Sequence, residues 1–274
     1  MSAEKIERLR LALEVALNDF DAVNCLRHLI VGMLGALHVP YGQADHFFST
    51  ELCEVRVIDL LSWERGLIAK LRGLGVYEHW PQRLDERCRL MFKQLKPYLH
   101  PGCSVVDVGC GSGDFGRVLV ESGYQVGLAD SIDWRTDTVA RQLPFLFVEN
   151  DYLHAARHAY DVVTLCTVLH HSDNPELLLE ECCRVAKRRV VILESVTGVG
   201  TEHELHRHVT TVVDWFYNNV FTALGTDRVN VPLNFKSVAK WVELAERFTG
   251  RKATFRLLGA DQRLNPLYHA IIIV

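Results

Sequence analysis

The sequence lacks the cysteine patterns that bind zinc or cross-link secreted proteins. Its eight cysteines contain no C-x-x-C pair and no zinc-ligand spacing. Cys182 and Cys183 are neighbours in a helical pattern, and most of the others sit in apolar runs, so we expect buried free thiols in a reducing compartment. No metal is expected. His203 and His206 are one helical turn apart, but their charged neighbours favour a solvent-exposed helix face over a metal site.

The sequence also lacks a long apolar run and an excess of positive charge. Its longest apolar run, residues 29–37, is far shorter than the roughly 20 residues of a membrane-spanning helix. The start of the chain, residues 1–8, is charged and helical, unlike a secretory signal. The formal net charge of −4 disfavours a protein that binds nucleic acid through a basic surface. We therefore expect a cytoplasmic protein without a membrane or nucleic-acid partner.

The hydrophobic pattern changes near Pro101. The preceding residues read as helices, beginning with an apolar stripe at spacings of three and four. That stripe consists of Ile6, Leu9, Leu13, Ala16, Phe20 and Val23. Further helices are expected at residues 55–74 and 84–98. Residues 1–100 thus form an N-terminal helical extension, and the sequence leaves open whether it packs on the main domain, covers a ligand as a lid or makes a dimer contact.

After Gly102, short apolar strands alternate with amphipathic helices. Near-continuous apolar strands of this kind are typical of a mostly parallel sheet covered by helices on both faces. Seven strands are expected, at residues 104–110, 125–130, 145–150, 160–168, 189–195, 254–258 and 268–274. Helices are expected at residues 114–122, 136–142, 175–186, 203–220 and 236–248. The sequence therefore predicts an α/β domain over residues 101–274, with a helical insertion at about 197–235.

A glycine-rich loop follows the first expected strand, in the stretch VVDVGCGSGDFG at residues 105–116. Residues 111–116 satisfy G-x-G-x-x-G, the dinucleotide-binding pattern, while residues 109–113 satisfy G-x-G-x-G, the loop that cradles S-adenosylmethionine. Asp130, at the end of the second expected strand, would suit the ribose of either ligand. The loop and this carboxylate do not choose between the two ligands.

Three other features favour S-adenosylmethionine. The α/β pattern runs to the last residue, which leaves no separate catalytic domain of the kind that an NAD enzyme would carry. Asp151 lies just past the third expected strand, where it adds a second acidic residue. The fourth expected strand leads into the stretch TVLHHSDNP at residues 167–175, which is followed by a helix.

With these four ordered motifs, the sequence resembles the class I S-adenosylmethionine-dependent methyltransferases, and among them the bacterial group that modifies small molecules. The resemblance covers about residues 100–274. It implies a Rossmann-like fold, S-adenosylmethionine as cofactor, and methyl transfer to an oxygen, nitrogen or carbon nucleophile of a small molecule.

The resemblance also implies a set of cofactor-binding residues. Gly109, Gly111 and Gly113 form the loop under the methionine part, where the backbone must approach the ligand. Asp107 helps to hold the ammonium group, and Asp130 accepts hydrogen bonds from both ribose hydroxyls. The other expected contacts are Asp151 with the adenine amino group, Ile132 and Tyr152 beside the adenine ring, and Thr167 at the end of the fourth strand. The alternative for the aspartates is a helix cap or a loop acid.

Two histidines and a glutamate are the candidate catalytic residues. His171, with His170 beside it, is the first candidate for a base, because in this family the fourth strand normally opens beside the methyl group. Either histidine could instead brace the loop. Glu194 ends the fifth expected strand at the same edge, where it could orient the substrate, act as the base or cap the next helix.

The expected helix at residues 203–220 falls where members of this family often build a substrate cover. Trp215 and Tyr217 lie off its apolar stripe and suit a planar or apolar acceptor, with core packing as the alternative for Trp215. The rival functions are a nucleic-acid or protein methyltransferase, an inactive methyltransferase-like binding protein and an NAD oxidoreductase. The N-P-P-aromatic motif of nucleic-acid amino methylation is absent at residues 167–170. The identity of the acceptor and a homodimer both stay open.

Overall fold

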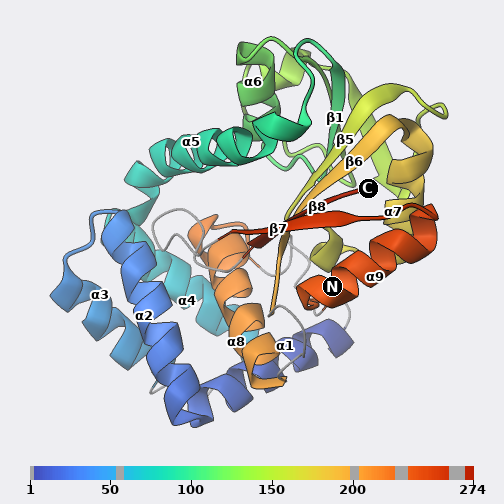
Figure 1. Cartoon of the computed structure of the whole chain (residues 1–274). Coiled ribbons are helices and arrows are strands. Elements are labelled where there is room, and N and C mark those ends of the chain that lie inside the picture. Colours follow the sequence, from blue (N-terminus) through green and yellow to red (C-terminus); the bar gives the residue numbers. More distant parts are fainter. Residues whose placement is uncertain (1–2, 54–58, 198–203, 226–233, 259–268) are drawn as a thin grey trace. The chain divides into compact units, whose positions relative to one another are not determined.

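The chain forms two compact units in a computed structural model, which describes residues 3–53, 59–197, 204–225, 234–258 and 269–274 (Figure 1). The sheet unit contains residues 84–200, 236–259 and 268–274, and the helical unit contains residues 1–83, 201–235 and 260–267. The sheet unit begins at Leu84, ahead of the expected boundary at residue 101. The second half of α5 (Val76–Leu95) accounts for this difference, because Cys88, Met91 and Leu95 are buried in the sheet unit's core.

The sheet unit is built on one mixed sheet in the order β4-β3-β2-β1-β5-β6-β8-β7. Its strands are β1 Ser104–Val108, β2 Gln125–Asp130, β3 Phe145–Glu149, β4 Tyr152–Leu153, β5 Tyr160–Cys166, β6 Ala186–Ser195, β7 Thr254–Leu258 and β8 His269–Ile273. The expected mostly parallel α/β sheet is confirmed. It has eight strands instead of the expected seven, because the chain turns back after β3 to form the two-residue strand β4.

Parallel pairing places the ends of β1, β2, β3, β5 and β6 at one edge of the sheet. The chain leaves β1 toward β2 and β3 on one side, and β5 and β6 lie on the other side. The strand order therefore reverses between β1 and β5. In open α/β sheets, ligands bind outside the carboxyl ends of the strands at such a reversal point.

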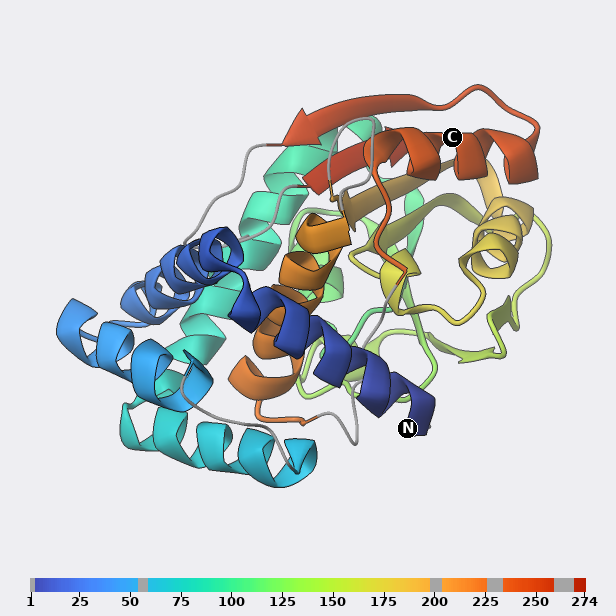
Figure 2. The same cartoon turned by 90° about the horizontal axis from the view of Figure 1, so that it is seen from below.

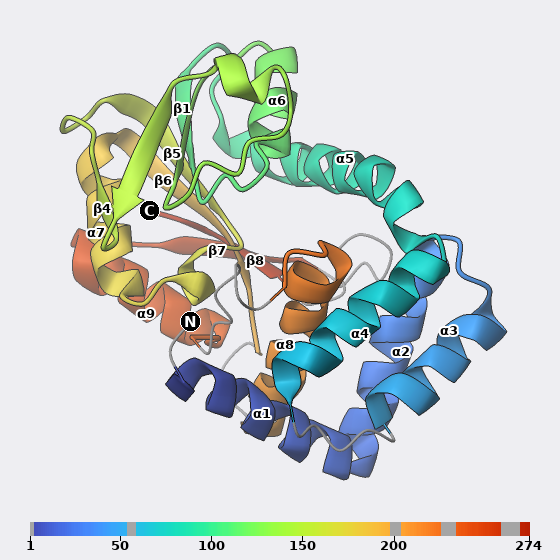
Figure 3. The ribbon, with the colours of Figure 1, turned by 180° about the vertical axis from the view of Figure 1, so that it is seen from behind.

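Helices cover both faces of this sheet, as expected. One face packs against α7 (Pro175–Val185) and α9 (Val238–Thr249), and the other against α6 (Asp114–Glu121) and the second half of α5 (Figure 3). Two of these helices begin at side-chain caps. Asn174 accepts a hydrogen bond from the N–H of Leu177, and Ser237 accepts one from the N–H of Lys240.

The helical unit has its own apolar core. Its elements are α1 Ala3–Asn18, α2 Phe20–Ala36, α3 Tyr41–Phe47, the π-helix η1 Phe48–Cys53, α4 Leu60–Gly73, the first residues of α5, α8 Glu204–Trp215 and the π-helix η5 Phe216–Phe221. Helix α1 packs against α8, which it crosses obliquely (Figure 2). The N-terminal segment therefore shares one core with a segment almost 200 residues later in the sequence. Among the described residues, no helix combines the length and apolar character needed to cross a membrane.

Three details differ from the expected elements. The apolar stripe that begins at Ile6 spans two helices, because the Asp19 carboxylate caps α2 by accepting from the N–H of Ala22, and Phe20 is 80% exposed. The expected helix at residues 136–142 is a 3-10 turn, η3 Ala140–Gln142, since Asp137 accepts from two backbone N–H groups there. The strand expected at residues 160–168 ends two residues early, at Cys166, and the 3-10 turn η4 Leu169–His171 follows shortly after it.

Parts of three expected segments lie outside the described residues. They are residues 55–58 of the expected helix at 55–74, residues 198–203 and 226–233 of the expected insertion at about 197–235, with His203 among them, and residue 268 of the expected strand at 268–274.

Candidate cofactor and active site

The glycine-rich loop connects β1 to α6 and has left-handed backbone at its three key positions. The φ angles are +71° at Gly109, +52° at Gly111 and +84° at Gly113. A Cβ atom on Gly109 would collide with Val168, and one on Gly113 would collide with Ala140. At Gly111, a Cβ would meet no described atom within 4 Å. All three glycines are expected to allow close approach by a ligand. The open space at Gly111 is consistent with this expectation, and the missing Cβ at Gly109 and Gly113 also leaves room for Val168 and Ala140.

Asp130 at the end of β2 fixes this loop. Its Oδ2 accepts a hydrogen bond of 2.8 Å from the N–H of Gly111, and its Oδ1 accepts one of 2.7 Å from the N–H of Ser131. Burial raises the pKa of Asp130, and these N–H groups partly offset that shift. The Ser131 hydroxyl also lies 3.4 Å from Oδ1, so the second lone pair of Oδ2 is the one left for a ribose hydroxyl. The geometry fits the predicted role for one of the two hydroxyls.

Asp107 near the end of β1 is almost fully buried, with 2% of its surface exposed. It accepts a hydrogen bond of 3.0 Å from the Thr164 hydroxyl on β5. Burial raises the pKa of Asp107 to about 7, because the charged carboxylate is desolvated, and the nearby charge of Asp130 raises it further. A ligand ammonium group would relieve this desolvation cost. The residues present therefore fit the methionine end of S-adenosylmethionine.

Asp151 joins the end of β3 to the loop before α7. It has a left-handed backbone, with φ +63°, and its carboxylate accepts from the Ser172 hydroxyl at 2.8 Å and from the N–H of Asn174 at 3.0 Å. Asp151 thus braces the loop before α7, which is the alternative role considered for it from the sequence. One lone pair on each of its oxygens is left for a ligand amino group. Tyr152 follows on β4, 44% exposed, with the Arg184 guanidinium 5.2 Å from its ring centre.

Phe147 is an apolar neighbour of Asp130 that the sequence argument missed. It lies directly opposite Asp130 in the β2–β3 register and is 52% exposed. Its ring contacts that of Phe145, with centroids 5.0 Å apart. Ile132, in the loop after β2, is 47% exposed. Strand alternation could have revealed Phe147, since it lies on the same face as Phe145, two residues away.

Arg87 on α5 is a second residue that the sequence argument missed. Its guanidinium lies 3.4 Å from the hydroxyl of Thr167, just beyond β5. Thr167 is held in left-handed backbone, with φ +59°, and its N–H donates to the carbonyl of Leu193 at 2.6 Å. A non-glycine residue in this conformation is strained, and such strain is concentrated at functional sites. No sequence signal distinguishes Arg87 from a solvent-facing arginine, because the contact joins residues 80 positions apart.

Glu194 at the end of β6 is completely buried and is bound on several sides. Its Oε2 accepts from the N–H of Leu169 at 2.9 Å, and its Oε1 accepts from the N–H of Ser195 at 2.8 Å. Its Oε1 also contacts Nδ1 of His170, a ring with no exposed surface. Glu194 and His170 therefore anchor the η4 turn to the sheet.

His171 is the half-buried member of the predicted catalytic group. Its ring centre lies 4.3 Å from that of His170. Its backbone N–H donates to the backbone carbonyl of Val168 at 2.8 Å within the turn. The structure thus brings His170, His171 and Glu194 together at the carboxyl ends of β5 and β6. Of these three residues, only His171 is not fully buried.

The two aromatic residues predicted to cover the substrate have different surroundings in the helical unit. Trp215 is fully buried, stacks on Trp63 with centroids 5.4 Å apart and donates its indole N–H to Glu64 at 2.6 Å. Core packing, the alternative for Trp215, is therefore what the structure shows. Tyr217 lies in η5, partly exposed, and its ring meets the edge of Trp80 with centroids 5.3 Å apart.

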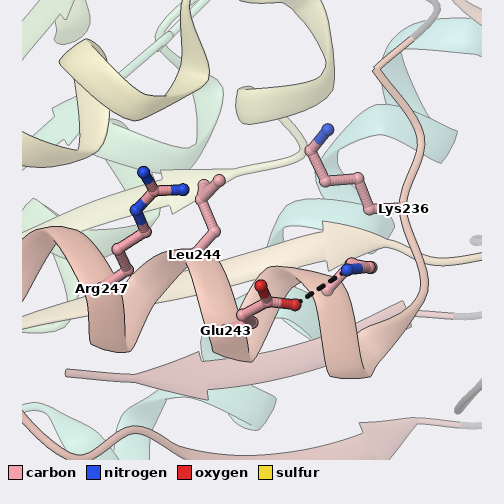
Figure 4. Close-up of a pocket in the computed structure, with 5 residues that line it drawn as sticks. Lys236, Glu243, Leu244 and Arg247 are labelled. Carbon is pink, nitrogen blue, oxygen red and sulfur yellow. Dashed lines mark hydrogen bonds and ion pairs between the residues drawn. The ribbon is translucent and has the colours of Figure 1, made fainter.

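A separate cavity of about 180 Å³ lies on the outer side of α9 (Figure 4). It is lined by Lys236, Lys240, Glu243, Leu244 and Arg247, and an ion pair of 2.9 Å joins Lys240 to Glu243. This volume is below the roughly 300 Å³ at which small-molecule pockets begin. The lining includes none of the predicted site residues, so we do not assign the cofactor to it.

Comparison with known proteins agrees with this geometry. Residues 77–227 match a family model described as a methyltransferase domain, which covers more than half of the chain. A ubiquinone biosynthesis O-methyltransferase from Azoarcus sp. (strain BH72) is 32% identical over 94 residues, which is 31% of this chain and 40% of that relative. The match thus spans less than half of the relative's length.

A solved structure shows the same fold at low sequence identity. A methyltransferase from Thermotoga maritima, described as S-adenosylmethionine-dependent and as a "possible histamine N-methyltransferase", superposes with a TM-score of 0.50 at 17% identity, covering 74% of this chain and 95% of its own. The 1,6-didemethyltoxoflavin N1-methyltransferase from Burkholderia thailandensis gives a TM-score of 0.47 at 12% identity, covering 80% and 92%. The fold, the glycine-rich loop and the family match agree, so the chain belongs to the methyltransferase-domain family and has the fold of a methyltransferase described as S-adenosylmethionine-dependent.

Proposed function

We propose that this enzyme methylates an oxygen, nitrogen or carbon nucleophile of a small molecule made in biosynthesis. The observation that carries the proposal is the arrangement at the carboxyl ends of β1 and β2. There, Gly111 faces open space, Asp107 offers a buried carboxylate and Asp130 a partly buried one. The net charge of −4 and the similarity to a ubiquinone biosynthesis enzyme support a small acceptor over a nucleic acid.

When bound, S-adenosylmethionine supplies a methyl group that is already activated on its sulfonium centre. We assign a ribose hydroxyl to Asp130 and the ammonium group to Asp107. Phe147 and Ile132 provide apolar surface for the adenine, and Asp151 offers an acceptor for its amino group. Arg87 supplies a cation for the cofactor's carboxylate. Thr167 holds Arg87 at the end of β5.

We assign the proton acceptor to His171. An attacking hydroxyl or amine loses a proton as it forms the new bond, and imidazole accepts it at neutral pH. Glu194 and His170 are positioning residues in this assignment, because both are fully buried and hold the turn that carries His171.

We assign recognition of the acceptor to the helical unit, consistent with a lid or substrate cover built from its N-terminal helices and α8. Trp80 and Tyr217 offer partly exposed rings, which suit a planar or apolar molecule. The eight cysteines all lie in the described part of the chain and none forms a disulfide there, which fits the reducing compartment that we propose for this protein.

Incubation of the purified enzyme with methyl-labelled S-adenosylmethionine tests the proposal. Three fractions of a cell extract are supplied separately: small molecules, nucleic acid and protein. Label in a small-molecule product supports the proposal. Label in RNA, DNA or protein assigns the enzyme to a macromolecular substrate, and cofactor binding without label in any fraction points to a binding protein that has lost catalysis.

A further inference from the structure

Strand β7 forms an open edge of the sheet. It pairs with β8 on one side only, and in the described part of the chain the sheet order ends there. Figure 2 shows β7 as the outermost strand at this rim. Its first four residues are all exposed. An edge strand offers unpaired backbone N–H and C=O groups that can pair with another strand.

One face of this edge is apolar. Phe255 is 51% exposed and Leu257 is 44% exposed. They lie opposite Ile272 and Ala270 of β8, on the sheet face that packs against α9. Because side chains alternate along a strand, Ala253 shares this face while Arg256 points to the other. The edge thus presents an apolar row beside backbone groups that pair with no further strand among the described residues.

The sequence of this strand is self-complementary in one antiparallel register. If Phe255 meets its own copy at a two-fold axis, Leu257 lies opposite Ala253 and Arg256 lies opposite Thr254. Apolar residues then face apolar residues, two phenylalanines form an aromatic cross-strand pair, and the arginine has a neutral neighbour. A two-residue shift that centres the axis on Arg256 would instead place two guanidinium groups opposite each other, which is unfavourable.

We propose that β7 pairs antiparallel with β7 of a second copy of this chain, so that two sheets join into one across a two-fold axis at Phe255. The interface is isologous, as the commonest homodimers are. A contact that consists mainly of one short strand from each copy is small, so the dimer forms reversibly and its population rises with protein concentration.

Sedimentation over about 5–200 µM protein tests the association. The wild-type mass should rise from the 31.2 kDa monomer toward twice that value. Phe255→Glu should stay monomeric at every concentration, because it places two carboxylates at the axis. Phe20→Glu is the matched control, since Phe20 is a phenylalanine of the helical unit that is 80% exposed, and its mass should follow the wild type. Melting temperatures establish that both variants are folded.

Cross-linking tests the register. In a background where the exposed Cys25 is serine, Phe255→Cys should form a disulfide-linked dimer under mild oxidation, and Arg256→Cys should give at least tenfold less. A wild-type chain that stays monomeric throughout would overturn the proposal. So would a Phe255→Glu variant that dimerises like the wild type, or equal cross-linking at both positions.

Discussion

The carboxylate of Glu194 lies against Nδ1 of His170, and neither side chain has exposed surface. Two backbone N–H groups, from Leu169 and Ser195, occupy the same carboxylate. A buried charge of this kind is stable only when it is fully paired, so the pair fixes the turn at the end of β5. His171, the next residue, is thereby held in place at the edge where ligands of this fold bind.

From this arrangement we predict that substitution of His171 lowers the catalytic rate, whereas substitution of His170 lowers the stability of the fold. His171→Ala should lower kcat by about 10²–10⁴-fold, the usual contribution of a positioned base, and leave S-adenosylmethionine affinity unchanged. The pH–rate profile should lose its acidic limb, because in the wild type protonated imidazole cannot accept the proton. Steady-state kinetics from pH 5 to 9, with calorimetric titration of the cofactor, measure both effects.

The matched variants are His170→Ala and Glu194→Gln. Each breaks the buried pair, so each should lower the melting temperature and keep the acidic limb of the profile. If Glu194→Gln removed that limb while His171→Ala kept it, the base would be Glu194 and the assignment of His171 would be wrong.

Asp130→Ala should weaken S-adenosylmethionine binding by about 1–3 kcal/mol, roughly 5–150-fold, the scale of a hydrogen bond to a charged group. Part of this loss comes from the glycine-rich loop, whose Gly111 N–H is held by the same carboxylate. Glu180→Ala, which removes an exposed carboxylate of α7, is the control and should bind like the wild type. Equal affinities of the two variants would remove Asp130 from the site.

Because the pKa of Asp107 is raised, we predict that folding stability and cofactor affinity change in opposite directions with pH. Its folded-state pKa of about 7 lies above the ordinary 3.8, so the folded protein binds the proton more tightly than the unfolded chain. The stability that this proton contributes is complete below about pH 4 and is lost as the pH rises through 7. Asp107→Asn should therefore melt several degrees higher than the wild type at pH 8 and show a flatter pH dependence.

Cofactor binding through the Asp107 carboxylate requires the charged form. Wild-type affinity for S-adenosylmethionine should fall as the pH falls from 8 to 6, and Asp107→Asn should bind weakly over that whole range. An Asp107→Asn variant that kept wild-type affinity would show that this carboxylate does not touch the ammonium group.

We predict that two leucines of the N-terminal helix α1 contribute differently to the free energy of unfolding. Leu13 is 2% exposed and belongs to the core of the helical unit, whereas Leu11 is 51% exposed. Leu13→Ala should cost about 2–5 kcal/mol of unfolding free energy, and Leu11→Ala less than about 0.5 kcal/mol. Urea denaturation measures both. Similar small losses would mean that α1 is an accessory segment and not part of the core.

The parts of this protein that the sequence predicted are those with a local signal. The strands of the parallel sheet are near-continuous apolar runs, and the glycine-rich loop and Asp130 stand at fixed distances along the chain. The break between α1 and α2 was not predicted, because the 3.6-residue period continues through Phe20 and conceals the capping role of Asp19.

The parts that could not be predicted depend on contacts between distant residues. Nothing near Arg87 indicates that its guanidinium reaches Thr167, and nothing near Glu194 indicates that it binds the turn at Leu169. In the same way, each segment of the helical unit shows only an apolar face. Which faces meet is decided by packing, so the shared core of α1 and α8 follows from the folded structure alone.

The central claim is that the open space above Gly111 holds the cofactor, and a pair of glycine variants tests it most directly. Gly111 and Gly123 both have left-handed backbone, and a Cβ on either would meet no described atom within 4 Å. Alanine at either position should therefore cost a similar 1–2 kcal/mol or so of stability. In calorimetric titration with S-adenosylhomocysteine, Gly111→Ala should lose at least tenfold in affinity while Gly123→Ala binds like the wild type; equal affinities for the two variants would contradict the account.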